Sequence, residues 1–256
     1  MGAGFNFAVA WLTFKSRINN LRPRLPDGGL SLESWDEEFG GNVGILLIPI
    51  PKLRIGLTYQ SPHYFTFGLR PFLSNLGPGL GAIGKRIGGA NVDVRLTEPQ
   101  QVMASALYEV MPNFSLMGNV GWQNWSEFGQ FPVGISAANQ KTVEANLHFS
   151  NIYQIAVGQQ YRFAEKWPWS AGFAFDSSPV SRTKRNVVLP IDRQLLYGTG
   201  LQYQINRNVT DGAAWEFMDA GPAPFSNSRE PLAGTLQGHY STNYLNFLAL
   251  NVIWKF

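Results

Sequence analysis

Residues 151–176 read NIYQIAVGQQYRFAEKWPWSAGFAFD, and this stretch decides the fold. Large apolar side chains alternate with small or polar ones on both sides of Ala164-Glu165-Lys166. In residues 151–163, Tyr153 and Val157 share one face, opposite Gln154. A period of two residues is typical of a β-strand whose two faces meet different surroundings. The stretch therefore predicts two antiparallel strands joined by a short turn, each near the ~9–11 residues of a tilted membrane strand.

The same alternation recurs along the chain. It is clear in residues 53–60 and 195–205 and weaker elsewhere. Residues 90–110 predict a strand that is broken near Glu98-Pro99, because proline cannot donate a hydrogen bond to a ladder. About ten strands are expected in all, a number that can form a barrel. They cover residues 4–14, 42–48, 53–60, 90–110, 114–122, 151–163, 167–176, 195–205, 209–218 and 240–256.

The predicted connections alternate in length. The short turns are residues 111–113, 164–166 and 206–208. The long loops are residues 19–38, 71–89, 129–150, 177–193 and 219–234. Outer-membrane barrels have short periplasmic turns and long external loops, whereas a soluble sandwich has no reason for this regularity.

The composition narrows the class of protein. Only 14% of the 256 residues are charged, against about 25% in an average soluble domain, yet no stretch approaches the ~20 apolar residues of a membrane helix. A soluble β protein with an apolar surface and a membrane barrel both remain. The eight Trp, nine Tyr and eighteen Phe residues favour a barrel with aromatic girdles. The net charge of +3 is scattered, so nucleic acid is not an expected partner.

The size of the side chains indicates which face of the strands contacts lipid. Consecutive strands place Trp, Tyr and Phe on one face and Gly, Ala, Gln or Arg on the other. Large rings would overfill the interior of a small barrel. The aromatic face is therefore expected to contact lipid and lipopolysaccharide, and the small and polar face to line a lumen.

The last strand carries a further signal. Counting back from Phe256, the residues Trp254, Val252 and Leu250 share one face. A terminal aromatic residue at the end of an alternating strand resembles the signal by which outer-membrane barrels are assembled. The barrel-assembly machinery is therefore an expected partner through Phe256. The alternative is an ordinary closing strand of a soluble β protein.

Several segments, in order, resemble the FadL-type long-chain fatty-acid and hydrocarbon transporters of the outer membrane. Residues 40–61 resemble a strand, tight turn and strand of that family. Leu96-Thr97-Glu98-Pro99 resembles its turn into the next strand, with Thr-Glu replacing the more usual residues. Residues 122–128 (WQNWSEF) resemble its Trp-Ser-Xaa-Phe segment, and residues 171–180 and 189–193 are the closest matches.

The resemblance implies a monomeric barrel of fourteen strands, plugged by a small N-terminal hatch domain. It implies that ligand enters from outside, binds in the lumen and leaves through a lateral opening or past the hatch. Residues 1–256 would then be one all-β, antiparallel transmembrane barrel unit, corresponding to the C-terminal portion of the family fold. The natural product is expected to extend upstream of Met1 by a signal peptide, a hatch and about four strands.

The alternation assigns candidate ligand-binding residues to the lumen. A fatty-acid carboxylate would require one or two cations among apolar walls, and Arg54 and Arg162 are the cations on the lumenal face. Gln123 and Gln202 are further polar residues of this face. The candidate site residues are Arg54, Gln60, Gln160, Arg162, Gln204 and Glu216. The alternative is that these side chains only solvate a channel or bond one another.

Other chemistry finds little support in the sequence. The three histidines, His63, His148 and His239, show no metal spacing, and cysteine is absent. Ser150 lies two residues from His148, which is a weak basis for a lipase site. Asp192 and Arg193 could contact a ligand, although an ion pair that anchors a loop is the simpler interpretation. We expect neither an enzyme nor a metal site.

The leading hypothesis is a passive transporter of hydrophobic small molecules, either long-chain fatty acids or aromatic or aliphatic hydrocarbons, in a Gram-negative outer membrane. No cofactor is expected, because the substrate moves down its gradient and binding must be weak enough for release. The alternative is a structural or adhesive barrel whose long loops bind partners.

Overall fold

The computed structural model describes residues 1–20, 25–81, 90–128, 130–136, 140–185, 190–228 and 234–255. Of residues 131–136 and 140–145 it describes the backbone alone. Within these ranges no helix has the length and apolar character needed to cross a membrane.

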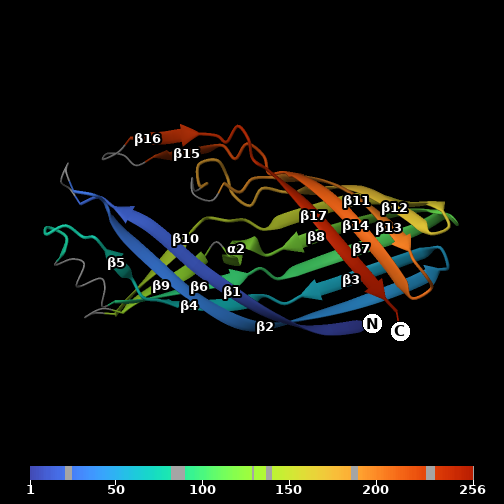
Figure 1. Ribbon diagram of the computed structural model, residues 1–256, viewed down its shortest axis with the longest axis horizontal. Coiled ribbons are helices and arrows are strands. Elements are labelled where there is room, and N and C mark those ends of the chain that lie inside the picture. Colours follow the sequence, from blue (N-terminus) through green and yellow to red (C-terminus); the bar gives the residue numbers. More distant parts are fainter. Residues whose placement is uncertain are drawn as a thin grey trace.

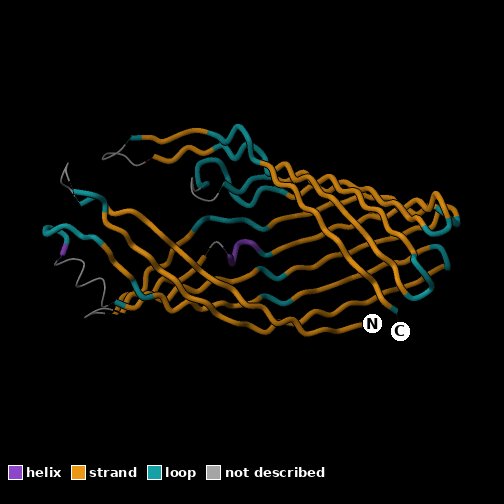
Figure 2. The backbone as a smooth tube through the Cα atoms, in the orientation of Figure 1, coloured by secondary structure: helices purple, strands orange, loops and turns teal. Residues whose placement is uncertain are grey.

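One large antiparallel sheet forms the barrel wall (Figures 1 and 2). Ten strands follow one another as hydrogen-bonded neighbours, so the predicted number of strands is confirmed. Strands β1 and β17 are the two edges of this sheet, and no pairing between them occurs in the described residues. The ten strands are β1 (Gly2–Ile18), β2 (Gly28–Ile50), β3 (Leu53–Gln60), β7 (Gln101–Met111), β8 (Phe114–Gln123), β11 (Ile152–Ala164), β12 (Trp167–Asp176), β13 (Gln194–Gln204), β14 (Val209–Asp219) and β17 (Tyr244–Trp254).

The outer face of this sheet is apolar. In β11, the side chains of Tyr153, Ile155 and Val157 are exposed by 62%, 52% and 59%. Neighbouring strands continue the band with aromatic contacts, such as Phe173 of β12 against Tyr197 of β13 at a ring-centroid distance of 5.2 Å. Such a surface would be costly in water but is favourable against lipid, as expected for a membrane barrel.

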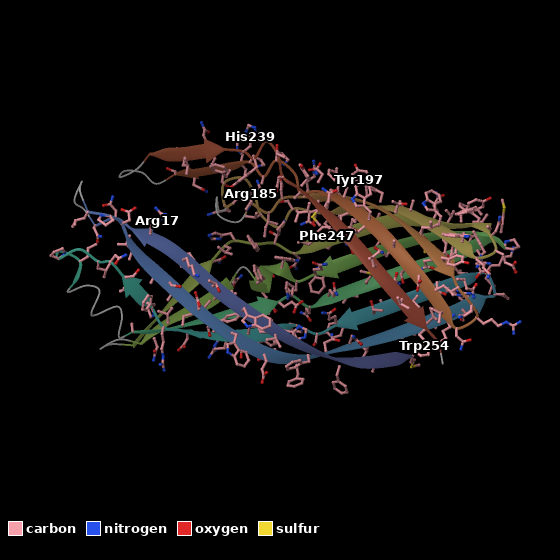
Figure 3. The ribbon with its side chains drawn as sticks, in the orientation of Figure 1. Arg17, Arg185, Tyr197, His239, Phe247 and Trp254 are labelled. Carbon is pink, nitrogen blue, oxygen red and sulfur yellow. The ribbon has the colours of Figure 1, made fainter. Side chains whose placement is uncertain are left out.

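Short turns lie at one end of the barrel and long connections at the other (Figure 2). The turn between β13 and β14 is closed by Asn206, whose side-chain oxygen accepts hydrogen bonds from the amides of Asn208 and Val209. This is the local bonding by which Asn favours turns. Figure 3 shows Trp254 near the end with the short turns, and Arg17 and His239 toward the opposite end.

A second sheet lies beyond the ends of four barrel strands. It contains β4 (His63–Leu69), β6 (Asn91–Glu98), β9 (Gln130–Ser136) and β10 (Gln140–Asn146), in the order β10-β9-β6-β4. We call it the outer sheet. Its strands continue β3, β7, β8 and β11 after a break, which falls at Pro62 between β3 and β4 and at Pro99 between β6 and β7. Proline interrupts a ladder because it has no amide hydrogen, so the predicted break near Glu98-Pro99 is confirmed.

The hairpin of β1 and β2 covers the outer sheet. Phe65, Phe67 and Leu69 of β4 form a buried cluster against the inner face of this hairpin. The ladder between β2 and β3 ends at Ser61, whose amide donates to the Gly41 carbonyl at 2.9 Å. Beyond it, β4 packs against β2, and the amide of Thr66 donates to the side chain of Asp36. The partly buried residues that pack on the cluster are Ala8, Ala10, Leu12, Leu32, Val92, Val94 and Leu96.

Several predicted loops are wrong in part. Strand β2 begins at Gly28, inside the loop expected at residues 19–38, and the loop expected at residues 129–150 contains β9 and β10. The strand β4 was not expected at all. Strand β4 nevertheless alternates as regularly as a wall strand, because every second residue from His63 to Leu69 is buried.

The region after β14 also differs from the prediction. It contains a small hairpin of β15 (Phe225–Ser228) and β16 (Thr235–Gly238), and the last strand begins at Tyr244 rather than at residue 240. The short β5 (Phe72–Ser74) pairs with β2 inside the loop expected at residues 71–89. Residues 21–24, 82–89, 129, 137–139, 186–189 and 229–233 of the predicted loops, and Phe256, lie outside the described residues.

Candidate functional site

A cavity of about 510 Å³ opens where the barrel wall and the outer sheet part. Its walls come from β1, from β4 and β6 of the outer sheet, from the adjoining ends of β3, β7 and β8, and from the short helix α2 (Trp125–Phe128). We call it the aromatic pocket. It is lined by Ala10, Trp11, Leu12, Gln60, Phe65, Phe67, Leu96, Glu98, Pro99, Gln101, Gln123, Trp125 and Phe128.

The rings of β4 reach this pocket because the strand alternates. His63, Phe65, Phe67 and Leu69 are buried, while the intervening residues are exposed. Phe65 and Phe67 lie nearly parallel, with their ring centroids 6.1 Å apart. This period of two residues is visible in the sequence, although no strand was predicted in residues 61–71.

Helix α2 holds a second group of rings at the pocket. The indole nitrogen of Trp125 donates to the side-chain oxygen of Gln123 at 2.7 Å, and its ring meets Phe128 edge-on at 5.1 Å. The amide of Ser126 donates to the side chain of Asn151, which satisfies a donor at the start of the helix. The WQNWSEF segment therefore folds into a fixed aromatic wall.

The polar edge of the pocket consists of three carboxamides and one carboxylate. Gln101 donates to the side-chain oxygen of Gln60 at 2.7 Å, across β7 and β3. Glu98 is 49% exposed, and one of its oxygens lies 2.8 Å from Nδ1 of His63. No lysine or arginine is among the described side chains that line the pocket.

His63 lies behind Glu98 and is only 3% exposed. Its contact with Glu98 does not have the geometry of a hydrogen bond, so neither ring nitrogen has a hydrogen-bond partner among the described residues. The ring fits only because residue 40 of β2 is glycine, since a Cβ there would overlap Nε2. The sequence predicts only that His63 is no metal ligand, and the structure buries it between two sheets.

The lumen of the barrel holds two further cavities, of about 550 and 520 Å³. The first is lined from eight strands, β2, β3, β7, β8 and β11 to β14, mainly by small residues of the alternating face. The structure therefore places the face with small and polar side chains inward, as the comparison of side-chain sizes predicts. Two predicted site residues, Arg54 and Glu216, line this first cavity.

The predicted cation Arg54 is already paired. Its guanidinium lies 2.9 Å from a carboxylate oxygen of Glu109 on β7. Glu216 lines both lumenal cavities, and its carboxylate has no ion-pair or hydrogen-bond partner among the described residues. The cation that sequence analysis assigned to a ligand carboxylate is thus largely neutralised.

The other predicted site residues are spread out. Gln60 lines the aromatic pocket. Gln160 donates to Ser170 at 3.4 Å, whereas Arg162 and Gln204 are exposed near the short turns. The last three residues line none of these three cavities. Ligand binding by the six residues stays a prediction.

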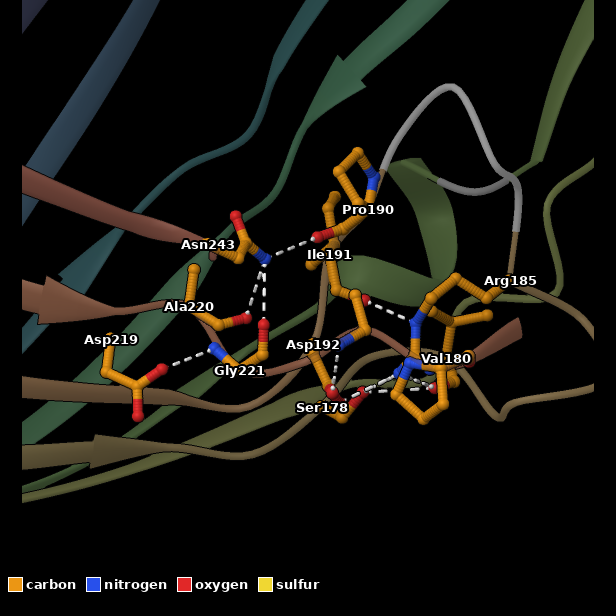
Figure 4. Close-up of polar contacts among 12 residues, drawn as sticks. Ser178, Val180, Arg185, Pro190, Ile191, Asp192, Asp219, Ala220, Gly221 and Asn243 are labelled. Carbon is orange, nitrogen blue, oxygen red and sulfur yellow. Dashed lines mark hydrogen bonds and ion pairs between the residues drawn. The ribbon is translucent and has the colours of Figure 1, made fainter. Parts of the chain in front are cut away.

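Asp192 and Arg193 anchor the loops between barrel strands. Figure 4 shows Asp192 beside Arg185. The buried Arg185 lies 2.8 Å from Asp192 and also donates to the carbonyls of Ile191, Val180 and Pro224. Arg193 lies 3.2 Å from Asp219. The interpretation of these residues as loop-anchoring ion pairs is confirmed.

The remaining histidines show no catalytic arrangement. The amide of His148 donates to the side chain of Asn146, and that of Ser150 donates to the Pro179 carbonyl. Among the residues described, no three His, Asp or Glu side chains gather as a metal site would require.

Comparison with known proteins gives consistent results. A family profile described as "Outer membrane protein transport protein (OMPP1/FadL/TodX)" matches residues 30–256. The long-chain fatty acid transport protein of Escherichia coli O6:H1 is 25% identical over 86% of this chain and 52% of its own length. Outer membrane protein P1 of Haemophilus influenzae is 23% identical over 85% of this chain and 47% of its own. The chain thus spans about half the length of these curated relatives.

Solved structures share the fold. A Pseudomonas aeruginosa FadL homologue superposes with a TM-score of 0.76 at 16% identity, over 98% of this chain and 63% of that one. The Ralstonia pickettii toluene transporter TbuX gives a TM-score of 0.60 at 16% identity, over 98% of this chain and 62% of that one. At this identity the likeness concerns the fold alone.

Proposed function

The chain belongs to the outer-membrane transport protein family that includes OMPP1, FadL and TodX, and from this premise we propose that it gives small hydrophobic molecules a passive route across the outer membrane. The observation that carries the proposal is the aromatic pocket, which lies between the outer sheet and the mouth of the lumen. The family is one of transport proteins rather than enzymes.

The pocket has the character of a binding site for small molecules. Sites of this kind are concave, mostly apolar and lined by a few oriented polar groups. Phe65, Phe67, Trp125 and Phe128 supply the apolar wall, and three glutamines supply neutral polar contacts. A ligand held mainly by apolar contacts binds without a cofactor and can leave again, which transport down a gradient requires.

Related proteins suggest the range of substrates. The Escherichia coli relative is named for long-chain fatty acids, and the Ralstonia structure for toluene. What these names share is a hydrophobic small molecule, and we propose this class for the present protein.

Quenching of Trp125 tests the proposal. A brominated alkane such as 1-bromododecane, added at fixed detergent concentration, should quench a component of the tryptophan fluorescence that is absent in Trp125→Phe. Leu12→Gln should weaken this binding about tenfold, because losing apolar contacts of this size costs about 1.4 kcal/mol. Leu25→Gln makes the same exchange at a residue that is not among those lining the pocket and should have little effect.

A structural or adhesive barrel would give a different result. Trp125 would then show no specific quenching, and shortening the long loops would abolish attachment to cells. That outcome would contradict the transport proposal.

A further inference from the structure

We propose that Glu98, backed by His63, makes the aromatic pocket select uncharged hydrophobic molecules, such as hydrocarbons and long-chain alcohols, over ionised carboxylates. The proposal rests on the transport function and makes Glu98 a residue that determines specificity within it.

The first observation is the sign of the charge at the pocket. Glu98 is the one charged residue among the described side chains of its lining, and the other polar groups are the neutral carboxamides of Gln60, Gln101 and Gln123. A hydroxyl group can donate to the Glu98 carboxylate or to a carboxamide oxygen. A ligand carboxylate can only accept hydrogen bonds and would meet a like charge, which opposes binding.

The second observation is the position of His63. The imidazole is 3% exposed and does not line the pocket, whereas Glu98 is 49% exposed and does. A ligand therefore meets the carboxylate and not the ring. The imidazole lies 2.8 Å from the carboxylate, on the side away from the pocket.

The path beyond the pocket offers an anion no better partner. In the lumen the cation Arg54 is matched by Glu109 at 2.9 Å, and Glu216 presents an unpaired carboxylate to both cavities among the residues described. Arg185 and Arg193, near the long connections, are matched by Asp192 and Asp219. Arg54, Arg185 and Arg193 are thus each paired with a carboxylate, with which a permeating anion would have to compete. Arg162, the other cation of the lumenal face, is exposed near the short turns and lines neither the pocket nor the two lumenal cavities.

A matched pair of ligands tests the proposal. 11-Bromoundecan-1-ol and 11-bromoundecanoate carry the quenching bromine at the same place and differ at the polar end. At about pH 8 the acid is ionised, because carboxylic acids ordinarily have pKa values near 4. In the native protein we expect the alcohol to quench Trp125 with a Kd at least about tenfold lower than that of the carboxylate.

Three variants separate the role of Glu98 from the general electrostatics of the pocket. Glu98→Gln should lower the Kd of the carboxylate, so that it exceeds the Kd of the alcohol by about threefold or less. The Kd of the alcohol should stay nearly unchanged. Glu127→Gln removes a nearby exposed carboxylate that does not line the pocket and should leave the difference as it was. Glu98→Asp keeps the charge and should retain the selectivity.

The outcomes are distinct. Equal binding of alcohol and carboxylate by the native protein would overturn charge selection and needs no variant to fold. If Glu98→Gln and Glu127→Gln increase the affinity for the carboxylate equally, the role of Glu98 is overturned. If neither ligand quenches Trp125, the transport proposal itself fails, and the selectivity with it.

Discussion

Gly40 and His63 illustrate how one residue controls the pocket. The imidazole occupies the space where a side chain at position 40 would begin. We predict that Gly40→Ala displaces His63 and lowers the midpoint of thermal unfolding, since overpacking a filled site costs about 1–3 kcal/mol. Gly41→Ala is the control, because a Cβ there would meet only a backbone oxygen at 3.7 Å. Equal midpoints for the two variants would refute the steric argument.

Two adjacent residues of β12, Phe173 and Ala174, allow the two faces of the wall to be compared. The ring of Phe173 is 37% exposed and packs against Tyr197 on the outer face, and the next residue, Ala174, faces the lumen; both contribute atoms to the lining of the lumenal cavity of about 550 Å³. We predict that Phe173→Arg destabilises the folded barrel by about 2–4 kcal/mol, as expected for arginine facing lipid near the midplane. Ala174→Arg should cost clearly less, because a lumenal side chain can be hydrated. Urea unfolding in lipid vesicles measures both, and similar losses would show that the face assignment is wrong.

At the scale of elements, the long connections are held by buried polar contacts as well as by buried apolar residues such as Pro179, Val180 and Ala223. Arg185, in the connection after β12, donates to the Pro224 carbonyl in the connection after β14. Its partner Asp192, also after β12 (Figure 4), accepts from the amide of Ala223. Asn243 adds bonds to the carbonyls of Ala220 and Gly221. Removing one partner of a buried pair leaves the other charge unsatisfied.

We therefore predict that Arg185→Met loosens these connections while the barrel strands stay folded. The local stability should fall by about 3 kcal/mol, and limited proteolysis should cleave residues 177–193 much faster. Lys184→Met removes an exposed cation next to it and is the matched control. Cleavage at the same rate in both variants would rule out the proposed role of Arg185.

At the scale of the whole molecule, the barrel wall depends on its surroundings. Its outer face exposes aromatic and aliphatic side chains on most strands, and only lipid or detergent can cover this surface favourably. The protein folded in detergent should show a β-type circular dichroism spectrum and should migrate differently on a gel before and after heating. A helical spectrum, or folding in plain buffer to a monomer, would contradict the membrane assignment.

The barrel wall was predictable because its signal is local. Within about ten residues, lipid on one face and a lumen on the other impose the alternation seen in β11 and β12. The number and approximate places of the wall strands could therefore be predicted from periodicity, and the break at Glu98-Pro99 from the proline. For Asp192 and Arg193 the sequence predicted loop-anchoring ion pairs, but not the partners Arg185 and Asp219.

The outer sheet and the candidate site depend on contacts that no local pattern encodes. Glu109 neutralises Arg54 across 55 residues of sequence, a pairing set by the register of β3 and β7. The aromatic pocket joins residues of β1, β4, β6 and α2, which meet only after the two sheets part. Alternation places a side chain on one face of its strand, but the partner it finds there is determined by how the strands pair and where they separate.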